Sequence, residues 1–305
     1  MSNYDVVIIG GGPAGLTSGL YSARAGLKTL LLERGMYGGQ IVNAHKVENY
    51  PGFPDGISGY ELVSLIHEQA TKYGLEIINA EATDIKPGKF HNIVTADSSF
   101  EAKTIIIAAG SEYTKLGAPG EAKYAGRGVS YCATCDGAFF KDMEIAVVGG
   151  GDTAITDALE LTQYASKISV IHRRDQLRAS QILQERAFAQ PKLQFIWNTV
   201  VEEINGEATV KELKLKNVKT SEISSLPVAG VFVAIGVNPN SQYFASAVKV
   251  DEAGHIIVDQ SMATLIPGIY AIGDIRKNSA RQVATAVGDG ATAAIAAFKY
   301  IKEQS

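Results

Sequence analysis

The sequence has very little cysteine, and Cys132 and Cys135 are the only two among its 305 residues. Disulfide-stapled domains are short and rich in cysteine, so these two residues are not a stabilising framework. A structural zinc site would need two more ligands, but there is no second CxxC pair, and the five histidines are scattered at positions 45, 67, 91, 172 and 255. We therefore expect no metal centre, and the short spacing of the cysteine pair becomes the informative feature.

The chain also lacks long hydrophobic runs and an excess of positive charge. The most apolar late segment, residues 291–298, is shorter than the roughly 18 residues needed to span a bilayer. The N-terminal residues show no basic flank followed by the apolar core of a signal peptide. Lys and Arg number 28 against 32 Asp and Glu, which argues against a nucleic-acid ligand. We expect a cytoplasmic protein without membrane or nucleic-acid partners.

A strand, glycine turn, helix and strand occur twice in the sequence. Residues 4–10 are apolar and β-branched and lead through glycines to a helix-compatible segment, 16–25, and a second strand, 29–32. The pattern returns with strands at 144–149 and 168–171. Gly10, Gly12, Gly15 and Glu33 match Gly149, Gly151, Ala154 and His172 at a constant offset of 149 − 10 = 139 positions. We predict an α/β protein with two Rossmann-like, three-layer (ββα) nucleotide-binding domains.

The end of the chain predicts how the two domains are connected. A further apolar strand at 268–274 precedes an alanine-rich helix from about 283 to 300, and neither has a counterpart in the second repeat. The simplest topology returns this tail to the first domain, and two crossings then permit a hinge. We predict a discontinuous first domain, residues 1–115 with 245–305, and an inserted second domain, residues 116–244.

The first glycine turn predicts a phosphate-binding site. Its first glycine permits the tight turn, its second lets the backbone approach a pyrophosphate, and a small third residue lets the helix pack closely. Such a motif also occurs in plain tight turns, but an acid stands about 20 residues on, where it accepts bonds from ribose hydroxyls. We assign dinucleotide binding to Gly10, Gly12, Pro13, Ala14, Gly15 and Glu33.

The second copy differs where its second strand ends. His172 replaces the acid and is followed by Arg173, Arg174 and, one helical turn on, Arg178. Guanidinium groups match phosphate oxygens, and the 2′-phosphate of NADPH would supply that anion. A solvated basic patch is the alternative. We predict NADPH at the second site, bound by Gly149, Gly151, Asp152, Thr153, Ala154 and these four basic residues.

The segment Cys132-Ala133-Thr134-Cys135 indicates redox chemistry, with two inert buried thiols as the alternative. One thiolate attacks a partner disulfide, and the second cysteine resolves the mixed disulfide. Asp136 follows as a candidate acid for the leaving thiolate, or as a helix cap. Phe139 and Phe140 form an aromatic pair that belongs either to the core or to an exposed anchor for a protein partner.

Together these motifs resemble those of the low-molecular-weight thioredoxin reductases of bacteria. The resemblance covers essentially the whole chain and rests on residues 10–15, Glu33, 38–40, 47–52, 132–137, 149–154, 172–174 with Arg178, 273–274 and 281–284. It implies a thioredoxin-disulfide reductase, in which NADPH reduces FAD and the flavin reduces the Cys132–Cys135 disulfide. The dithiol would then reduce thioredoxin or a similar small dithiol protein.

The resemblance also assigns residues to the two cofactors. FAD would be held non-covalently in the first domain, with Glu33 on the adenosine ribose and Asp274 on the ribityl chain. The flavin would be lined by Gly39, Gln40 and Asn49 on one side and by Arg281, Gln282 and Val283 at its edge. The second domain would hold NADPH, with Ile235 and Gly236 as further contacts.

For the chemistry, the resemblance implies that Cys132 attacks thioredoxin, Cys135 faces the flavin and Asp136 serves as the acid. It further implies a homodimer and a large rotation between the domains, because disulfide and nicotinamide must take turns at one flavin. At one point the chain departs from the family: where relatives commonly carry two acidic residues, it has Thr156 and Asp157. This departure leaves room for some use of NADH.

Three other functions share parts of the pattern. A ferredoxin or flavodoxin NADP reductase of related fold generally lacks the CxxC pair, and a thiol oxidase generally lacks the NADPH cluster, whereas this chain has both. A nucleotide-binding redox sensor is the non-enzymatic alternative, for which the sequence supplies no signalling partner. The sequence therefore favours the thioredoxin-linked enzyme.

Overall fold

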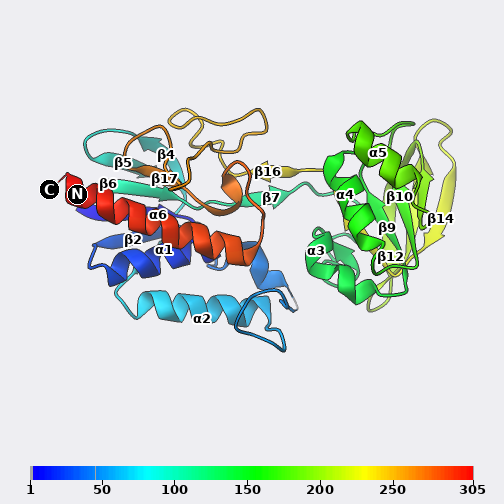
Figure 1. The fold of residues 1–305 in the computed structure, drawn as a ribbon, viewed down its shortest axis with the longest axis horizontal. Helices are drawn as coiled ribbons and strands as arrows, with labels where there is room; N and C mark the ends of the chain where they lie inside the picture. Colours follow the sequence, from blue (N-terminus) through cyan, green and yellow to red (C-terminus); the bar gives the residue numbers. More distant parts are fainter. Residues whose placement is uncertain (1–2, 45, 305) are drawn as a thin grey trace. The chain divides into compact units, whose positions relative to one another are not determined.

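The computed structural model describes residues 3–44 and 46–304, so His45 lies outside the described residues. The chain divides into unit 1, Met1–Glu112 with Asn238–Ser305, and unit 2, Tyr113–Val237. In Figure 1, unit 1 combines the two ends of the chain, blue to cyan and orange to red, and unit 2 is the green and yellow middle. The boundaries expected from the sequence lie slightly C-terminal to these divisions.

Unit 1 contains a seven-stranded sheet within its described residues. The strands are β1 (Asn3–Ile9), β2 (Thr29–Glu33), β3 (Glu76–Asn79), β4 (Ala82–Lys86), β5 (His91–Thr95), β6 (Ser99–Ile107) and β17 (Ile269–Ala271). Their order is β3-β2-β1-β6-β5-β4, with β17 paired to β6. The pairs β4–β5 and β5–β6 are antiparallel, and the other pairs are parallel. The C-terminal segment therefore completes a sheet that the N-terminal segment begins.

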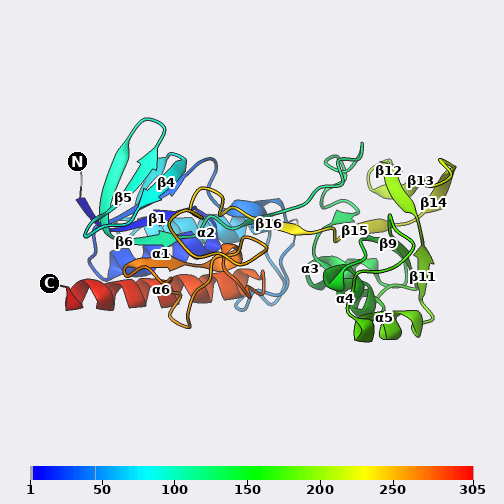
Figure 2. The same ribbon diagram turned by 90° about the horizontal axis from the view of Figure 1, so that it is seen from above.

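Helices cover one face of this sheet, and α1 packs against both α2 and α6 (Figures 1 and 2). Their bounds are α1 (Pro13–Arg24), α2 (Gly59–Thr71) and α6 (Val283–Glu303). Along β1, Val6 and Ile8 share a core with Leu16 of α1. Val7, which points to the opposite face, packs in a second core that includes Phe244. Because both faces of a parallel strand are buried, β1 is apolar at successive positions rather than alternating.

Unit 2, all of whose residues are described, has three layers. A five-stranded parallel sheet in the order β11-β10-β9-β15-β8 lies between helices and an antiparallel sheet, β12-β13-β14. The strands are β8 (Val129–Ser130), β9 (Glu144–Val148), β10 (Lys167–Ile171), β11 (Leu193–Ile196), β12 (Thr199–Gly206), β13 (Val210–Asn217), β14 (Ile223–Pro227) and β15 (Gly230–Val233). The helices are α3 (Ala133–Asp136), α4 (Asp152–Leu161) and α5 (Gln181–Phe188). The predicted fold class is confirmed.

The two segments that lead from one unit to the other pair as a two-stranded sheet of β7 (Ser111–Tyr113) and β16 (Val237–Pro239). In unit 2, the N–H of Thr114 donates to the carbonyl of Gly236 at 3.0 Å. In unit 1, the N–H of Asn240 donates to the carbonyl of Gly110 at 3.0 Å. Each unit therefore has a backbone hydrogen bond of its own that joins the two connecting segments where they enter it.

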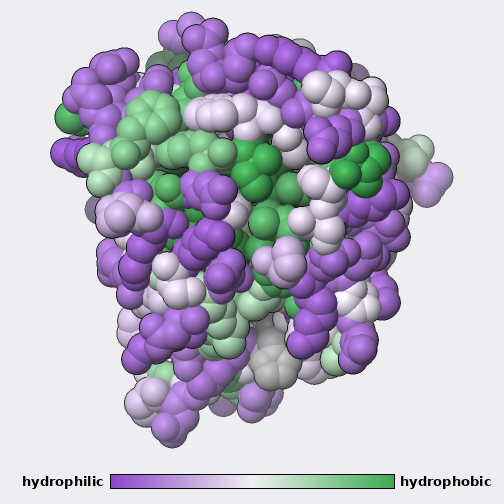
Figure 3. All heavy atoms as spheres, turned by 90° about the vertical axis from the view of Figure 1, so that its right-hand side faces the viewer, coloured by the Kyte–Doolittle hydropathy of each residue, from purple (hydrophilic) through white to green (hydrophobic). Residues whose placement is uncertain are grey.

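Some hydrophobic side chains reach the surface among hydrophilic ones (Figure 3). In unit 2 these include Ile182 and Phe188 of α5. The ring centroid of Phe188 lies 4.9 Å from that of Phe195, which stacks on Trp197 at 5.1 Å. Phe195 belongs to β11, the edge strand of the parallel sheet, and Trp197 directly follows this strand. Among the described residues, no helix has both the length and the apolar character to cross a membrane.

Candidate functional site

The first glycine turn joins β1 to α1 and requires glycine at two positions. Gly10 has a φ of +108°, which disfavours other residues. A Cβ on Gly15 would lie 1.8 Å from the carbonyl oxygen of Gly10, so only glycine allows helix and turn to approach this closely. The helix begins at Pro13, and its N-cap residue, Gly12, has no side chain that could cap the amides of the first turn. These amides and the helix dipole suit an anion such as a pyrophosphate.

Glu33 ends β2 beside this turn. One of its carboxylate oxygens accepts the N–H of Gly11 at 2.6 Å, and the other accepts the N–H of Gly35 at 2.9 Å. A Cβ on Gly11 would lie only 3.1 Å from the Glu33 carboxylate. Two backbone donors thus hold the carboxylate in place, and its remaining lone pairs suit the hydroxyls of a ribose.

Several residues expected at the flavin make contacts within unit 1. The side-chain amide of Gln40 donates to the carbonyl of Ser111. Asn49 Nδ2 donates to Gln282 Oε1 at 3.1 Å, although the two residues are 233 positions apart. Gly39 has a φ of +65° and approaches the first glycine turn so closely that a Cβ on it would lie 3.4 Å from a turn Cα. The fold thus brings Asn49 to Gln282 and brings Gly39 to the phosphate-binding turn.

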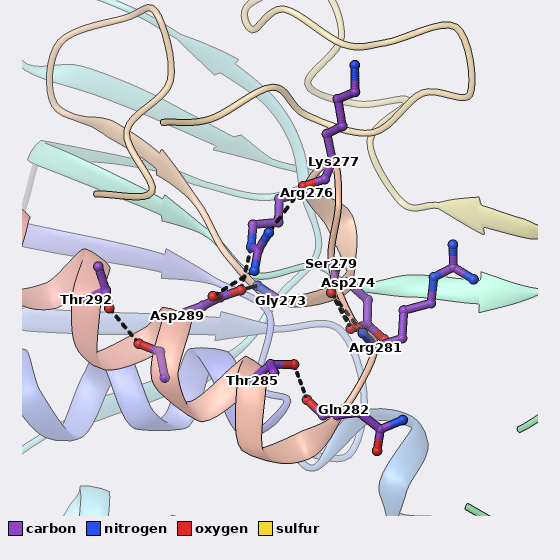
Figure 4. Close-up of polar contacts among 11 residues, drawn as sticks. Gly273, Asp274, Arg276, Lys277, Ser279, Arg281, Gln282, Thr285, Asp289 and Thr292 are labelled. Carbon is purple, nitrogen blue, oxygen red and sulfur yellow. Dashed lines mark hydrogen bonds and ion pairs between the residues drawn. The ribbon is translucent and has the colours of Figure 1, made fainter. Parts of the chain in front are cut away.

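The Gly273-Asp274 turn follows β17 and leads to the start of α6. Ser279 Oγ donates to Asp274 Oδ1 at 3.2 Å and accepts the N–H of Arg281 at 3.2 Å (Figure 4). Burial raises the pKa of Asp274, whereas the Ser279 hydrogen bond and the Arg281 charge act in the opposite direction. Arg281 has a φ of +54°, and α6 begins two residues later at Val283. One serine therefore holds the Asp274 carboxyl next to the segment that enters α6.

Asp289 of α6 holds the same turn from the helix side. Its carboxylate pairs with Arg276 through two bonds, 2.6 Å to Nε and 3.0 Å to Nη2, and accepts the N–H of Gly273 at 3.0 Å (Figure 4). The Asp289 and Arg276 side chains are only 9% and 15% exposed. Sequence reasoning missed this pair. The available signal was that Asp289 is the only charged residue between positions 283 and 298.

The second glycine turn repeats the construction of the first. Gly149 has a φ of +152°, and a Cβ on it would lie 2.5 Å from the Cβ of Ala154. Helix α4 begins at Asp152, and its N-cap, Gly151, again has no side chain to cap the first amides. Asp152 Oδ1 accepts the N–H of Ser180 at 2.6 Å. Unit 2 therefore offers a second helix N-terminus suited to an anion.

His172 occupies in unit 2 the place that Glu33 occupies in unit 1. Its ring packs against Gly150, where a Cβ would come within 2.4 Å of it, and the side chain is 4% exposed. Burial lowers the pKa of His172, and the neighbouring arginines lower it further, so the ring is neutral at pH 7. The buried Nε2 atom has no hydrogen-bond partner among the described residues. His172 thus supports the turn sterically, and the positive charge comes from the arginines.

The three arginines are exposed on a loop that is attached to this turn. The N–H groups of Arg178 and Ala179 both donate to the carbonyl of Gly150, at 2.6 and 3.2 Å. Within the described part of the chain, none of the guanidinium groups of Arg173, Arg174 and Arg178 forms an ion pair. Their charges are therefore available to an anion at the turn.

The remaining positions expected at NADPH lie at the surface of unit 2. Thr153 is exposed in the first turn of α4, and Thr156 is exposed one turn further on. Ile235 is 36% exposed and precedes Gly236, whose φ is +134°. The departure from the family pattern at Thr156 thus lies on the surface and leaves the core of α4 intact.

Cys132 and Cys135 form a disulfide bond across the single turn of α3. Cys132 is the N-cap residue, and its Sγ accepts the N–H of Cys135 at 3.2 Å. When the disulfide is reduced, this donor favours negative charge on Cys132. This geometry fits the role expected of Cys132 as the attacking thiolate.

Asp136 ends α3 next to the disulfide. Its N–H donates to the carbonyl of Cys132 at 3.1 Å, and its Oδ2 accepts a hydrogen bond from Ser130 Oγ at 2.6 Å. Burial raises the pKa of Asp136, and the Ser130 bond partly offsets this effect. A raised pKa favours the protonated carboxyl that a general acid needs. Sequence reasoning did not single out Ser130, because a serine six residues before a carboxylate has no distinctive spacing.

The two phenylalanines after α3 differ in environment. The ring of Phe140 packs edge-on against Phe232, with centroids 5.3 Å apart and planes at 72°. Phe139 is 46% exposed. Phe140 therefore belongs to the core of unit 2, and Phe139 is available to a protein partner.

Comparison with known proteins places the chain in a family. The family model described as pyridine nucleotide-disulphide oxidoreductase matches residues 4–290. The chain belongs to this family.

Its relatives include thioredoxin reductases. Those of Listeria innocua and Bacillus subtilis are 50% and 48% identical to the chain, over 98% of this chain and 94% and 95% of theirs. The crystal structure of thioredoxin reductase from Streptococcus pyogenes superposes with a TM-score of 0.96 at 48% identity and covers 99% of both chains. The predicted resemblance is confirmed. The predicted enzyme class, an oxidoreductase of the thioredoxin reductase type, and the implied cofactors FAD and NADPH are confirmed with it.

Replacing Asp289 by Asn should destabilise the protein by about 3 kcal/mol, since it leaves the buried Arg276 guanidinium without its counter-ion. Urea unfolding followed by circular dichroism measures the loss. Glu112→Gln is the matched control, because Arg34 and Glu112 pair at a similar 2.7 Å but are 51% and 59% exposed. The control should lose less than about 1 kcal/mol. Equal losses in both variants would contradict the role of Asp289.

Proposed function

We propose that the chain is an NADPH-dependent thioredoxin-disulfide reductase. The observation that carries the proposal is the Cys132–Cys135 pair and its surroundings. Cys132 Sγ accepts a hydrogen bond from the Cys135 amide, and Asp136, whose carboxyl has a raised pKa, directly follows the pair. This pair lies in the same unit as the second glycine turn, to which the arginine loop is attached. The substrate follows from the relatives, which are named thioredoxin reductases.

The two cofactors suit different units. In unit 1, Glu33 and the first glycine turn fit the ribose and pyrophosphate of FAD, and Asp274 with the Asn49–Gln282 pair lies among the residues assigned to its ribityl chain and flavin. In unit 2, the arginine loop fits the 2′-phosphate of NADPH. When bound, the two cofactors supply the two electrons that open the Cys132–Cys135 disulfide.

The remaining chemistry belongs to the chain itself. The Cys132 thiolate attacks a sulfur of the thioredoxin disulfide and forms a mixed disulfide, and Asp136 protonates the thioredoxin thiolate that leaves. The Cys135 thiolate then attacks Cys132 Sγ, which reforms the internal disulfide and expels the second thioredoxin thiolate. One disulfide is reduced and one is regenerated, so the two electrons are accounted for.

Three wider properties are part of this proposal. The NADPH residues and the disulfide belong to unit 2, whereas the FAD residues belong to unit 1, which supports a rotation that lets each use the flavin in turn. The paired strands β7 and β16 are the natural place for the hinge. The homodimer rests on the family resemblance. A cytoplasmic location is supported by cysteine usage, since both cysteines serve the redox pair.

Cys132→Ser should abolish NADPH-driven reduction of thioredoxin, because the nucleophile is lost. The rate is measured by coupling the thioredoxin thiols to a chromogenic disulfide. The internal control is the bleaching of the flavin absorbance by NADPH, which should persist because Cys132 belongs to neither glycine turn. Wild-type turnover in this variant would refute the dithiol relay.

The double variant Arg173→Ala/Arg174→Ala should raise the KM for NADPH at least about tenfold, since each hydrogen bond to a charged group contributes about 1.5–3 kcal/mol. The KM for NADH should not change, because NADH lacks the 2′-phosphate. Arg186→Ala, an exposed arginine on α5, serves as the control. An equal rise for both nicotinamides would mean that the arginines do not select the phosphate.

A further inference from the structure

Ser130, the last residue of β8, forms hydrogen bonds with both ends of the helical turn α3, at Cys132 and at Asp136. Its Oγ lies 2.6 Å from Asp136 Oδ2, accepts the N–H of Cys132 at 3.1 Å and lies 3.4 Å from the carbonyl oxygen of Cys132. The side chain is 4% exposed, so water does not compete freely for these contacts. Among the described residues, no other side chain donates a hydrogen bond to the Asp136 carboxyl.

A hydroxyl has one hydrogen, so Ser130 can donate to only one of its two acceptors at a time. When Asp136 is ionised, the hydrogen points to its carboxylate. When Asp136 is protonated, the carboxyl O–H can donate to Ser130 Oγ, and the hydroxyl hydrogen is free to turn to the carbonyl of Cys132. The hydroxyl therefore has a good arrangement in both protonation states.

We propose that Ser130 is the positioning residue for the acid. Its hydroxyl changes its hydrogen-bond partner with the protonation state of Asp136 and holds the carboxyl in a fixed position beside the backbone of Cys132. The proposal rests on the dithiol function proposed above. The hydrogen bonds of the Ser130 hydroxyl go to the Asp136 carboxyl and the Cys132 backbone, so Ser130 acts through Asp136.

The surroundings leave Ser130 as the main polar influence on the acid. Burial raises the pKa of Asp136, and the Ser130 bond to the ionised form lowers it. The helix packed against α3 is α4, which carries Asp157 and Glu160, and Glu160 accepts from Thr134 at 3.2 Å. Tyr131, next to Ser130, donates to Glu121 at 2.8 Å. On the sheet side, β15 places the uncharged Phe232 opposite Ser130.

The direction of the effect follows from these opposing influences. Removing the hydroxyl removes a hydrogen bond from both forms of the carboxyl, but the bond to the ionised form is the stronger because its acceptor is charged, so the pKa of Asp136 should rise further. The step that consumes the Asp136 proton slows as pH rises through that pKa. In Ser130→Ala the alkaline fall of kcat/KM for thioredoxin should therefore move to higher pH.

The test measures the titration of Asp136 in two ways. Carboxyl carbon chemical shifts of aspartate-labelled, oxidised protein report the midpoint directly, with the signal assigned by its loss in Asp136→Asn. The pH profile of kcat/KM for oxidised thioredoxin reports it in turnover. Both should shift upward in Ser130→Ala by up to about one pH unit, the equivalent of one lost hydrogen bond.

Two controls separate this role from a loss of structure. Ser130→Thr retains the hydroxyl and should keep the wild-type midpoint, and Ser130→Cys, a weak donor, should shift upward by less than the alanine variant. Ser169→Ala removes a buried serine from β10 of the same sheet and should leave both profiles unchanged. An Asp136 midpoint that is the same in Ser130→Ala, Ser130→Cys and wild type overturns the proposal.

The two readouts also distinguish the proposal from the function on which it rests. If the chemical-shift midpoint moves but the alkaline limb of kcat/KM does not, Ser130 positions Asp136 as proposed, and Asp136 is not the acid in turnover. If Asp136→Asn retains the alkaline limb, the same conclusion about the acid follows. An upward shift of both readouts that disappears in the Asp136→Asn background supports both statements.

Discussion

Both nucleotide-binding units depend on a close approach between the middle glycine of a turn and the side chain that ends the following strand. In unit 1, Gly11 lies against Glu33, and in unit 2, Gly150 lies against the His172 ring. A Cβ at either glycine would press on that side chain, so turn, strand end and helix start are positioned together. Because the helix N-terminus is left without a side-chain cap, the contact that packs the fold also creates a site for an anion.

The residue at the strand end then decides which nucleotide each unit suits. The Glu33 carboxylate accepts hydrogen bonds from hydroxyls and would repel a 2′-phosphate. His172 is buried and neutral at the matching position, so that repulsion is absent. The loop that follows is attached through Arg178 to the carbonyl of Gly150, which keeps the arginine charges at the turn. In the proposed function, this one change at the strand end, together with a short basic loop, distinguishes the cofactors of two copies of one architecture.

Much of this structure could be predicted from local sequence patterns, whereas contacts that form only on folding could not. The first strand was expected at 4–10 and spans Asn3–Ile9, and the last helix was expected at 283–300 and spans Val283–Glu303. The pairs Asp289–Arg276 and Ser130–Asp136 are separated by 13 and 6 positions, and each joins two different segments, so the periodicity of a single helix or strand does not reveal them. The burial of His172 was equally hidden, because a histidine before two arginines has the sequence pattern of a solvated basic cluster.

The redox pair needs two opposed conditions within one short segment: negative charge on a sulfur and a proton held nearby. The first comes from the start of α3, where the Cys135 amide donates to Cys132 Sγ, and the second from its end, where burial raises the pKa of Asp136. A single helical turn is too short to be rigid by itself. Ser130 bonds to both ends of it, and β8 pairs in register with β15 of the parallel sheet. In the proposed function, the relative placement of the thiolate and the acid is therefore set by the sheet that also carries the second nucleotide turn, so one scaffold serves both parts of the chemistry.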